Sequence, residues 1–107
     1  MTATFIKDET EFDSLLANEP VLVVDCTASW CGPCKLVAPL MDKLAEQYGD
    51  RVKVFKLDID PPNKPVATRF GIRSIPAVMF FKNGELVETI VGVKPYEDFT
   101  SATERLF

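Results

Sequence analysis

Residues 21–24, Val-Leu-Val-Val, constrain the fold of this 107-residue chain more than any other feature. All four side chains are apolar, so a strand formed here is apolar on both faces and belongs at the centre of a covered sheet. The apolar residues then change to helical spacing, which predicts a long helix with Gly49 as its stop signal. Pro39 lies inside this helix and must remove one backbone hydrogen bond. Its apolar positions are Leu36, Val37, Leu40, Met41, Leu44 and Tyr48.

Shorter apolar runs and their turn residues predict the remaining elements. Further strands are expected at residues 5–6, 52–57, 77–81 and 85–91, the last two joined by a tight hairpin at Asn83-Gly84. Further helices are expected between the capping pattern Asp8-x-x-Glu11 and Pro20, between Asn63 and Gly71, and from Pro95 onward.

The resulting order, β-α-β-α-β-α-β-β-α, predicts the α/β class. The alternating units give a mainly parallel layer, and the terminal hairpin adds an antiparallel pair. We therefore expect a three-layer α/β/α fold with a central mixed five-stranded sheet and helices on both faces. No repeat, low-complexity tract or Gly/Ser linker divides the sequence, so residues 1–107 are expected to form one domain.

Composition removes several classes of function. The chain has no histidine, which excludes most zinc sites, haem ligation through histidine and every Cys-His or Ser-His catalytic pair. Its net charge of −4 argues against nucleic acid as a partner. No apolar run approaches the roughly 18 residues that span a bilayer, and residues 1–8 lack the features of a secretory signal. We expect no membrane association and a cytoplasmic location, or an organelle stroma if a transit peptide was removed.

The charge is unevenly distributed along the chain. Residues 61–84 contain no acidic residue and carry four basic ones, Lys64, Arg69, Arg73 and Lys82. A run of charge is usually a solvated surface, and the alternative is a mildly positive face that is presented to a partner. The sequence leaves both interpretations open.

The segment with the clearest chemistry is residues 30–35, Trp-Cys-Gly-Pro-Cys-Lys, between the central strand and the long helix. Two residues between the cysteines allow a small disulfide ring when the segment forms the first turn of a helix, where Pro33 is tolerated. This places Cys31 at the helix N-terminus, whose unpaired N–H groups and dipole stabilise a thiolate. Cys34, one turn further in, should be shielded. We therefore expect Cys31 to be the nucleophile and Cys34 the resolving cysteine.

A C-x-x-C pair can also be half of a zinc site. Zinc prefers four ligands, and the sequence offers no second pair and no histidine, so that Cys26 alone remains. The position of the pair at a strand-to-helix turn favours redox chemistry instead, and we expect no metal. The chain also lacks the Gly-rich dinucleotide fingerprint, so we expect no bound cofactor.

The Trp-Cys-Gly-Pro-Cys-Lys segment and its spacing from the downstream features resemble the thioredoxin family over nearly the whole chain. The resemblance implies a thioredoxin domain with the thioredoxin fold and a protein-disulfide reductase activity through Cys31 and Cys34, serving electron transport and cell redox homeostasis. It also implies the partners, which are disulfide-containing target proteins and a thioredoxin reductase linked to NADPH or ferredoxin. The protein itself is expected to be a monomer.

Two charged residues match the family pattern. Asp25, at the end of the apolar strand, corresponds to the buried acid that assists proton transfer as Cys34 attacks. An acid in this position would be desolvated, which raises its pKa, although a carboxylate at a strand end can also face water. Lys56 corresponds to the lysine that lies near this acid and modulates it, whereas on its own it is typical of a surface lysine.

Ile75-Pro76 corresponds to the family's cis-proline loop facing the cysteines, although a proline that starts a strand is usually trans. The Ile75 backbone would then pair with an extended segment of the target protein. The resemblance assigns the walls of this shallow substrate groove to Trp30, Gly32, Pro33, Ile75, Pro76 and Gly92.

The sequence departs from the family pattern at two places. Cys26-Thr27 stands where thioredoxins commonly carry an aromatic pair, and Ala77 stands where many have threonine. Thr27 removes packing beside Asp25, which bears on how deeply that acid is buried. Cys26 is expected to be a small core residue, since buried cysteine is usually inert, and the alternative is a regulatory or mixed-disulfide role.

A second class of function uses the same groove without redox turnover, because some thioredoxins serve as binding subunits of other proteins. Within the fold, oxidants and isomerases often carry histidine between the cysteines, which stabilises the thiolate. Gly32-Pro33 offers no such charge. We therefore expect a reductant, with the binding subunit as the alternative.

Overall fold

The structure is a computed structural model that describes residues 2–107. Its strands are β1 (Thr4–Phe5), β2 (Val21–Thr27), β3 (Lys53–Asp58), β4 (Ala77–Lys82) and β5 (Glu85–Val91). Its helices are α1 (Glu9–Asn18), α2 (Cys34–Tyr48), α3 (Lys64–Arg69) and α4 (Tyr96–Glu104), with a 3-10 turn at Gly49–Arg51. Apart from that turn, the order of the elements is the predicted one. No helix within residues 2–107 combines the length and the apolar character needed to cross a membrane.

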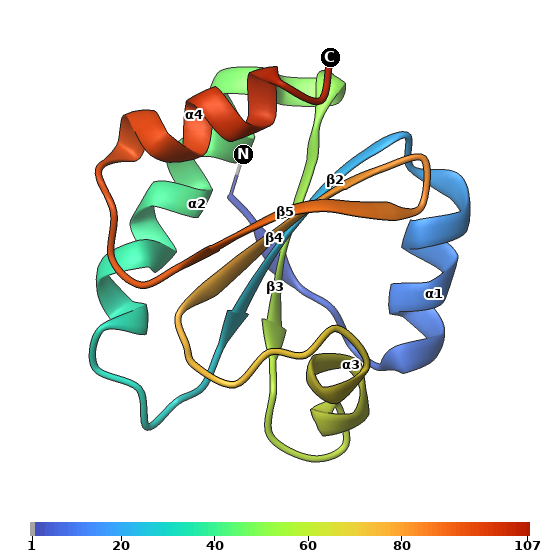
Figure 1. The fold of residues 1–107 in the computed structure, drawn as a ribbon, viewed down its shortest axis with the longest axis vertical. Helices are drawn as coiled ribbons and strands as arrows, with labels where there is room; N and C mark the ends of the chain where they lie inside the picture. Colours follow the sequence, from blue (N-terminus) through green and yellow to red (C-terminus); the bar gives the residue numbers. More distant parts are fainter. Residues whose placement is uncertain (1) are drawn as a thin grey trace.

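The strands form one five-stranded mixed sheet, as predicted, in the order β1-β3-β2-β4-β5. β2 runs parallel to β3 and antiparallel to β4, while β1 is parallel to β3 and β5 antiparallel to β4. The apolar strand β2 therefore lies at the centre. Figure 1 shows the helices on both sides of the twisted sheet, α2 and α4 on one side and α1 and α3 on the other. This arrangement is the expected three-layer α/β/α fold.

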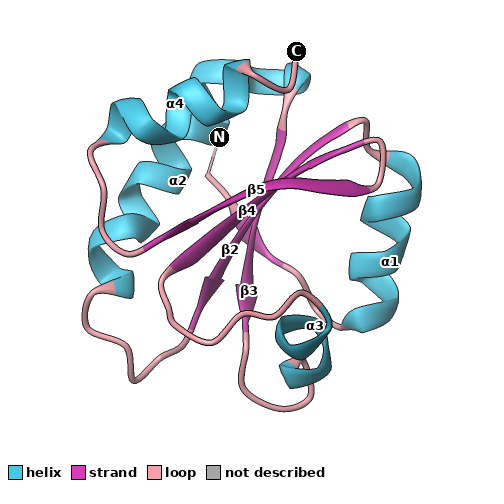
Figure 2. Ribbon diagram, in the orientation of Figure 1, coloured by secondary structure: helices cyan, strands magenta, loops and turns pink. Residues whose placement is uncertain are grey.

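Alternate side chains of β2 point to opposite faces of the sheet and build two separate cores. Val23 packs in the core beneath α2 and α4, which includes Phe99, whereas Leu22 packs in the core beneath α1 and α3, which includes Phe12. Figure 2 shows the strands enclosed between these two pairs of helices. The same alternation places Asp25 on the face of Val23, so the acidic residue of β2 lies on the side of α2.

Helix α1 begins where the capping pattern predicts, with one difference. The Asp8 carboxylate accepts the N–H of Glu11 at 2.8 Å, so Asp8 is the N-cap. In a reciprocal capping box the Glu11 carboxylate would accept the N–H of Asp8. It accepts the N–H of Lys7 instead, at 2.7 Å. The two side chains still satisfy two backbone donors at the entry to the helix.

Helix α2 ends at the predicted stop signal and contains the predicted proline. Gly49 has a φ of 55°, in the range that favours glycine, and its N–H donates to the carbonyl of Ala45. Pro39 lies inside the helix and has no N–H, so the carbonyl of Lys35 loses its usual helical partner.

The β4–β5 hairpin has the predicted tight turn. Asn83 and Gly84 have φ values of 50° and 83°. Two successive positive values define a type I′ turn, whose twist matches that of the flanking strands. A Cβ added at Gly84 would lie 3.2 Å from the Leu16 carbonyl oxygen, so the turn also packs closely on α1.

Helix α3 begins directly after Asn63, as predicted, whereas α4 begins one residue later than predicted. The Asn63 side chain stands at the N-cap of α3 but makes no capping hydrogen bond. The Oδ1 atom of Asn63 is buried without a hydrogen-bond partner among the described residues. Pro95 lies one residue before α4, because its ψ of 148° is extended and not helical.

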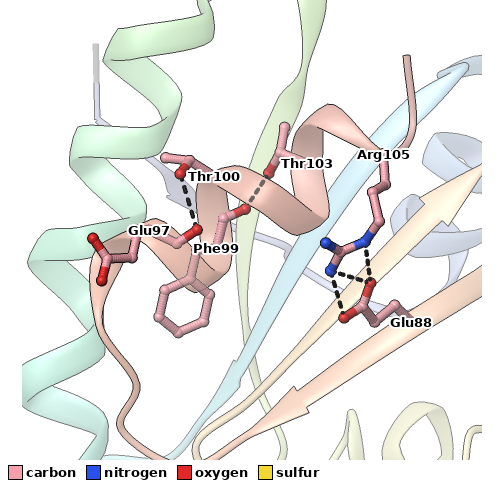
Figure 3. Close-up of polar contacts among 6 residues, drawn as sticks. All are labelled: Glu88, Glu97, Phe99, Thr100, Thr103 and Arg105. Atoms are coloured by element: carbon pink, nitrogen blue, oxygen red, sulfur yellow. Dashed lines mark hydrogen bonds and ion pairs between the residues drawn. The ribbon is translucent and has the colours of Figure 1, made fainter.

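Helix α4 is held to the sheet by apolar and polar contacts. Phe99 is fully buried against the sheet, and the Thr103 hydroxyl donates to the Phe99 carbonyl at 2.8 Å. Figure 3 shows the Arg105 guanidinium donating to the Glu88 carboxylate of β5, at 2.8 to 3.2 Å. The C-terminal helix is therefore fixed to the edge strand beside it.

Replacing Phe12 by alanine should destabilise the fold strongly. Phe12 is fully buried, and its ring packs edge-on against the rings of Phe70 and Phe81 at centroid distances of 5.7 and 5.9 Å. The lost burial and the cavity should lower the free energy of unfolding by about 3–5 kcal/mol, measured by urea denaturation followed by circular dichroism.

Phe5→Ala is the matched control for this prediction, because Phe5 is 59% exposed. This substitution should lower the free energy of unfolding by less than about 1.5 kcal/mol, because the Phe5 side chain buries little apolar surface in the folded state. Equal losses in the two variants would contradict the placement of Phe12 in the core.

Candidate active site

The cysteine pair lies in the loop between the C-terminal end of β2 and the start of α2 (Figure 1). Cys31 and Cys34 form a disulfide, with their Cα atoms 5.4 Å apart. The ring closes across Gly32 and Pro33, as the spacing predicts. The third cysteine, Cys26, is buried and unpaired.

The start of α2 differs from the prediction. Its first helical residue is Cys34, so Cys31 precedes the helix, and Pro33 takes the N-cap position. The N–H of Lys35 donates to the carbonyl of Gly32 at 3.0 Å, which is three residues back and not four. This tighter turn closes the small ring and leaves Cys31 outside the regular helix.

The helix N-terminus nevertheless acts on the Cys31 sulfur. The N–H of Cys34 donates to Cys31 Sγ at 3.3 Å. This N–H belongs to the first residue of α2, at the positive end of the helix dipole. A thiolate at Cys31 would therefore gain a hydrogen bond and a favourable field, both of which lower the pKa of a thiol.

Cys31 is the more accessible of the two cysteines. Cys31 is 5% exposed and Cys34 is 1% exposed, so Cys34 is shielded as predicted. Both belong to a small apolar cluster with Ala28, against which Ile59 and Ile75 pack. A reagent from solvent meets the sulfur of Cys31 first.

The loop before β4 packs against the cysteines. The Ile75–Pro76 peptide bond is cis, as expected, and the side chain of Ile75 contacts the cysteine cluster. The Pro76 carbonyl accepts the N–H of Gly92 at 2.8 Å. Within residues 2–107, neither backbone group of Ile75 bonds to another backbone group. The N–H and C=O of Ile75 are therefore free to pair with an extended peptide.

Trp30 is held by a residue that the sequence does not single out. Trp30 is 67% exposed, and its indole N–H donates to both carboxylate oxygens of Asp60, at 3.1 and 3.2 Å. Asp60 lies in the loop after β3, where a lone aspartate carries no functional signal. Beside this pair is a hollow of about 350 Å³ that continues towards α3, with a lining that includes Lys64 and Arg73.

The acid-free stretch of residues 61–84 does not form one continuous positive face. Arg69 is paired with Glu9 and Asp13 of α1, at 3.4 and 2.8 Å. Lys64 and Arg73 both line the hollow described above. Lys64 and Arg73 therefore lie beside Trp30, in a hollow that the acidic Asp60 also lines.

Asp25 is fully buried although Thr27 replaces a bulky aromatic residue. Neither of its carboxylate oxygens has a hydrogen-bond partner among the described residues. Burial raises the pKa of Asp25 from its ordinary value of 3.8 to about 7, with the Lys56 ammonium opposing this rise and the Asp42 carboxylate adding to it. The expectation of a desolvated acid is confirmed. A carboxyl group that titrates near neutrality can both accept and return a proton under working conditions.

Lys56 lies beside Asp25 but bonds to a different acid. The two residues are register partners on β2 and β3. The Lys56 ammonium forms its ion pair with Asp42 of α2, with 3.1 Å between Nζ and Oδ1. Asp42 is the second residue of this site without a sequence signal, because an acid on a partly exposed helix face is common.

Cys26 is fully buried beneath α1 and α3, on the opposite face of β2 from Asp25. Burial raises the pKa of Cys26 to about 12, and the negative charge of Asp25 contributes to this rise. The thiol of Cys26 therefore stays protonated and unreactive near neutral pH. This agrees with its interpretation as a small core residue.

The assembled residues are suited to the exchange of disulfides. They provide a cysteine pair joined as a disulfide, an amide N–H on the more accessible sulfur, and a buried acid whose pKa is raised to about 7. A loop with unpaired backbone groups lies against the pair. Among residues 2–107, no three histidine, cysteine, aspartate or glutamate side chains are grouped as a metal site requires.

Comparison with known proteins gives one consistent family. Residues 3–105 match the thioredoxin family. "Thioredoxin 1" of Synechococcus elongatus is 46% identical, over 87% of this chain and 86% of its own length. "Thioredoxin M-type, chloroplastic" of Spinacia oleracea is 43% identical over 94% of this chain, and the match spans 55% of the length of that relative. The solved structure of thioredoxin from Plasmodium falciparum superposes with a TM-score of 0.87 at 29% identity, covering 96% of this chain and 98% of that chain.

The buried acid should make the stability of the protein depend on pH. Between pH 3.8 and about 7, Asp25 is ionised in the unfolded chain and protonated in the folded one. The folded state then binds more protons, so the free energy of unfolding falls as the pH rises through this range and levels off above it. The difference in pKa corresponds to about 4 kcal/mol.

Asp25→Asn removes this titration and tests the prediction. The stability of the variant relative to the native protein should be about 4 kcal/mol greater at pH 8 than at pH 4, measured by urea unfolding followed by circular dichroism. Asp50→Asn, at an exposed aspartate, should change this difference by less than about 0.5 kcal/mol. A constant difference between Asp25→Asn and the native protein at all pH values would contradict the burial of a titrating acid.

Proposed function

The chain belongs to the thioredoxin family of dithiol–disulfide oxidoreductases, and we propose that it reduces disulfides in target proteins through Cys31 and Cys34. The observation that carries the proposal is the disulfide at the start of α2, with the N–H of Cys34 on the Cys31 sulfur. In the reduced protein the same N–H would stabilise a Cys31 thiolate, and the thiolate is the form that attacks disulfides.

In the first step, the Cys31 thiolate attacks one sulfur of the target disulfide. A bond forms between Cys31 and that sulfur, the target's own S–S bond breaks, and the second target sulfur leaves as a thiolate. The role of nucleophile falls to Cys31 because it is the more exposed cysteine and the one that accepts the helix N–H.

In the second step, Cys34 gives its proton to the carboxylate of Asp25 and attacks the sulfur of Cys31. The Cys31–Cys34 disulfide forms, the bond to the target breaks, and the target leaves with both of its sulfurs reduced. Two electrons have then passed from the dithiol to the target. The pKa of Asp25, near 7, supports its role as the proton acceptor in this step.

The residues between the cysteines support the direction of electron flow. A cationic residue there would stabilise the reduced thiolate and make the pair a stronger oxidant. Gly32 and Pro33 carry no charge. The pair is therefore proposed to give electrons and not to withdraw them.

The target is proposed to bind in the groove that Trp30, Gly32, Pro33, Ile75, Pro76 and Gly92 line. Its extended chain pairs with the free N–H and C=O of Ile75, which adds a short strand beside the disulfide. The hydrogen bond from the Gly92 N–H to the Pro76 carbonyl fixes the loop that carries Ile75. The exposed indole of Trp30 offers a further apolar surface.

Members of the family act on protein disulfides and are reduced by a thioredoxin reductase. For this chain we propose a reductase that draws electrons from NADPH or ferredoxin and returns the Cys31–Cys34 disulfide to the dithiol. We also propose that residues 1–107 act as one monomeric domain. The named cyanobacterial and chloroplastic relatives support a location in a cytoplasm or an organelle stroma.

The protein should catalyse the reduction of insulin by dithiothreitol, followed as turbidity when the freed chains precipitate. A variant with both Cys31→Ser and Cys34→Ser should return the rate to the uncatalysed background, because no exchangeable sulfur remains. If the native protein itself shows no catalysis, the binding subunit without redox turnover becomes the better interpretation.

The two cysteines should differ in their ability to trap targets. Cys34→Ser leaves the nucleophile without its resolving partner, so mixed disulfides between Cys31 and target proteins should accumulate on non-reducing gels. Cys31→Ser should trap at most about a tenth as much, since Cys34 is the shielded sulfur. Equal trapping by both single variants would reverse or remove the assigned roles.

A further inference from the structure

Asp25 lies next to a lysine that bonds elsewhere. Asp25 and Lys56 are register partners on the parallel strands β2 and β3, and the Lys56 side chain is only 12% exposed. Both carboxylate oxygens of Asp25 are nevertheless without a hydrogen-bond partner among the described residues. The Lys56 ammonium is paired with Asp42 of α2, at 3.1 Å. Lys56 is thus close enough to act on Asp25, but its ammonium group is held by Asp42.

We propose that Asp42 is a positioning residue for the exchange reaction: it holds the Lys56 ammonium towards α2 and so leaves the carboxylate of Asp25 free to take the proton of Cys34. This inference rests on the proposed function, because it concerns the second step of that reaction. Asp42 acts only through Lys56 and Asp25, and not on the reacting sulfurs themselves.

The geometry around Asp42 suits it to this role. Its Oδ1 atom accepts the backbone N–H of Ala3 at 3.0 Å and also contacts the Lys56 ammonium. Two donors from different parts of the chain thus meet on one carboxylate oxygen of α2. The side chain of Asp42 is about one-third exposed, so its own charge is stabilised by water as well as by these contacts.

Three elements determine the charge around Asp25. β3 contributes Lys56, which lowers the pKa of Asp25, and α2 contributes Asp42, which raises it. On β4 the register partner of Asp25 is the uncharged Val78. The adjacent Cys26 thiol is neutral near pH 7, because burial raises its pKa to about 12. The Lys56–Asp42 pair is therefore the adjustable part of this environment.

The arrangement has a direct consequence for proton transfer. If Lys56 bonded to Asp25, the ionised carboxylate would be stabilised and its affinity for a proton would fall. A weaker base removes the proton of a buried thiol less readily. By holding Lys56, Asp42 keeps the proton affinity of Asp25 in the range in which it can serve Cys34.

The test measures the titration of Asp25 in the oxidised protein, by NMR of the 13C-labelled aspartate carboxyl carbons. The Asp25→Asn variant identifies the signal. Asp42→Asn keeps an oxygen for the N–H of Ala3 but removes the charge that holds Lys56. The pKa of Asp25 should then fall by about one unit. Asp42→Glu should restore it to within about 0.3 units, since the carboxylate returns.

Two comparisons separate release of Lys56 from the simple loss of a charge. Glu46→Gln removes an exposed acid from the same helix, about one turn away, and should leave the Asp25 titration within about 0.2 units of the native value. In a Lys56→Met background, Asp42→Asn has no ammonium to release, so its effect should shrink to less than half. Equal shifts with and without Lys56, or no shift in Asp42→Asn, would overturn the proposal.

The same variants distinguish this proposal from the proposed function. The NMR titration needs no reductase and no target, so it judges the role of Asp42 even if the protein reduces nothing. Insulin reduction by the native protein together with an unchanged Asp25 titration in Asp42→Asn would remove only the role of Asp42. With Cys34 present, the pH dependence of target release from the mixed disulfide should lie lower in Asp42→Asn than in the native protein, by the same amount as the titration.

Discussion

The exclusion of water from one carboxylate is the constraint on which the site depends. Asp25 is the acidic residue of the central strand, and packing on both faces of that strand leaves it no contact with solvent. A buried acid without a hydrogen-bond partner lowers the stability of the fold at neutral pH. The packing that stabilises the protein thus also raises the proton affinity of Asp25. The central strand therefore contributes both to the core and to the chemistry of the site. β2 ends two residues beyond Asp25, at Thr27, and the disulfide loop follows directly.

Much of the fold was predictable because its elements have clear and different periods. The continuous apolar run at residues 21–24 indicates a strand covered on both sides, and the Asn83-Gly84 pair specifies its own turn geometry. The cysteine spacing indicates the disulfide in the same local way. Helix starts were predicted less well, at Cys34 and at Pro95, because a tight turn or an extended proline moves the first helical residue without changing the apolar pattern.

The residues missed at the site share a physical reason. Asp60 and Asp42 act through contacts with residues far away in the sequence, 30 positions in the case of Trp30 and Asp60. Neither acid belongs to a local pattern, and only the folded sheet brings Lys56 between Asp25 and the helix that carries Asp42. A functional group whose residues are close together in the sequence can be recognised from its motif. Contacts between residues that only the fold brings together cannot be recognised in this way.

The placement of the single tryptophan has a practical consequence. Trp30 is the only indole of the sequence, and it lies on the surface beside the disulfide and not inside either core. The fluorescence of an indole depends on its immediate surroundings. The intrinsic fluorescence of this protein should therefore report whether the neighbouring disulfide is oxidised or reduced. The same fluorescence reports little on the packing of the two cores. Unfolding of the cores has to be followed by a backbone signal such as circular dichroism.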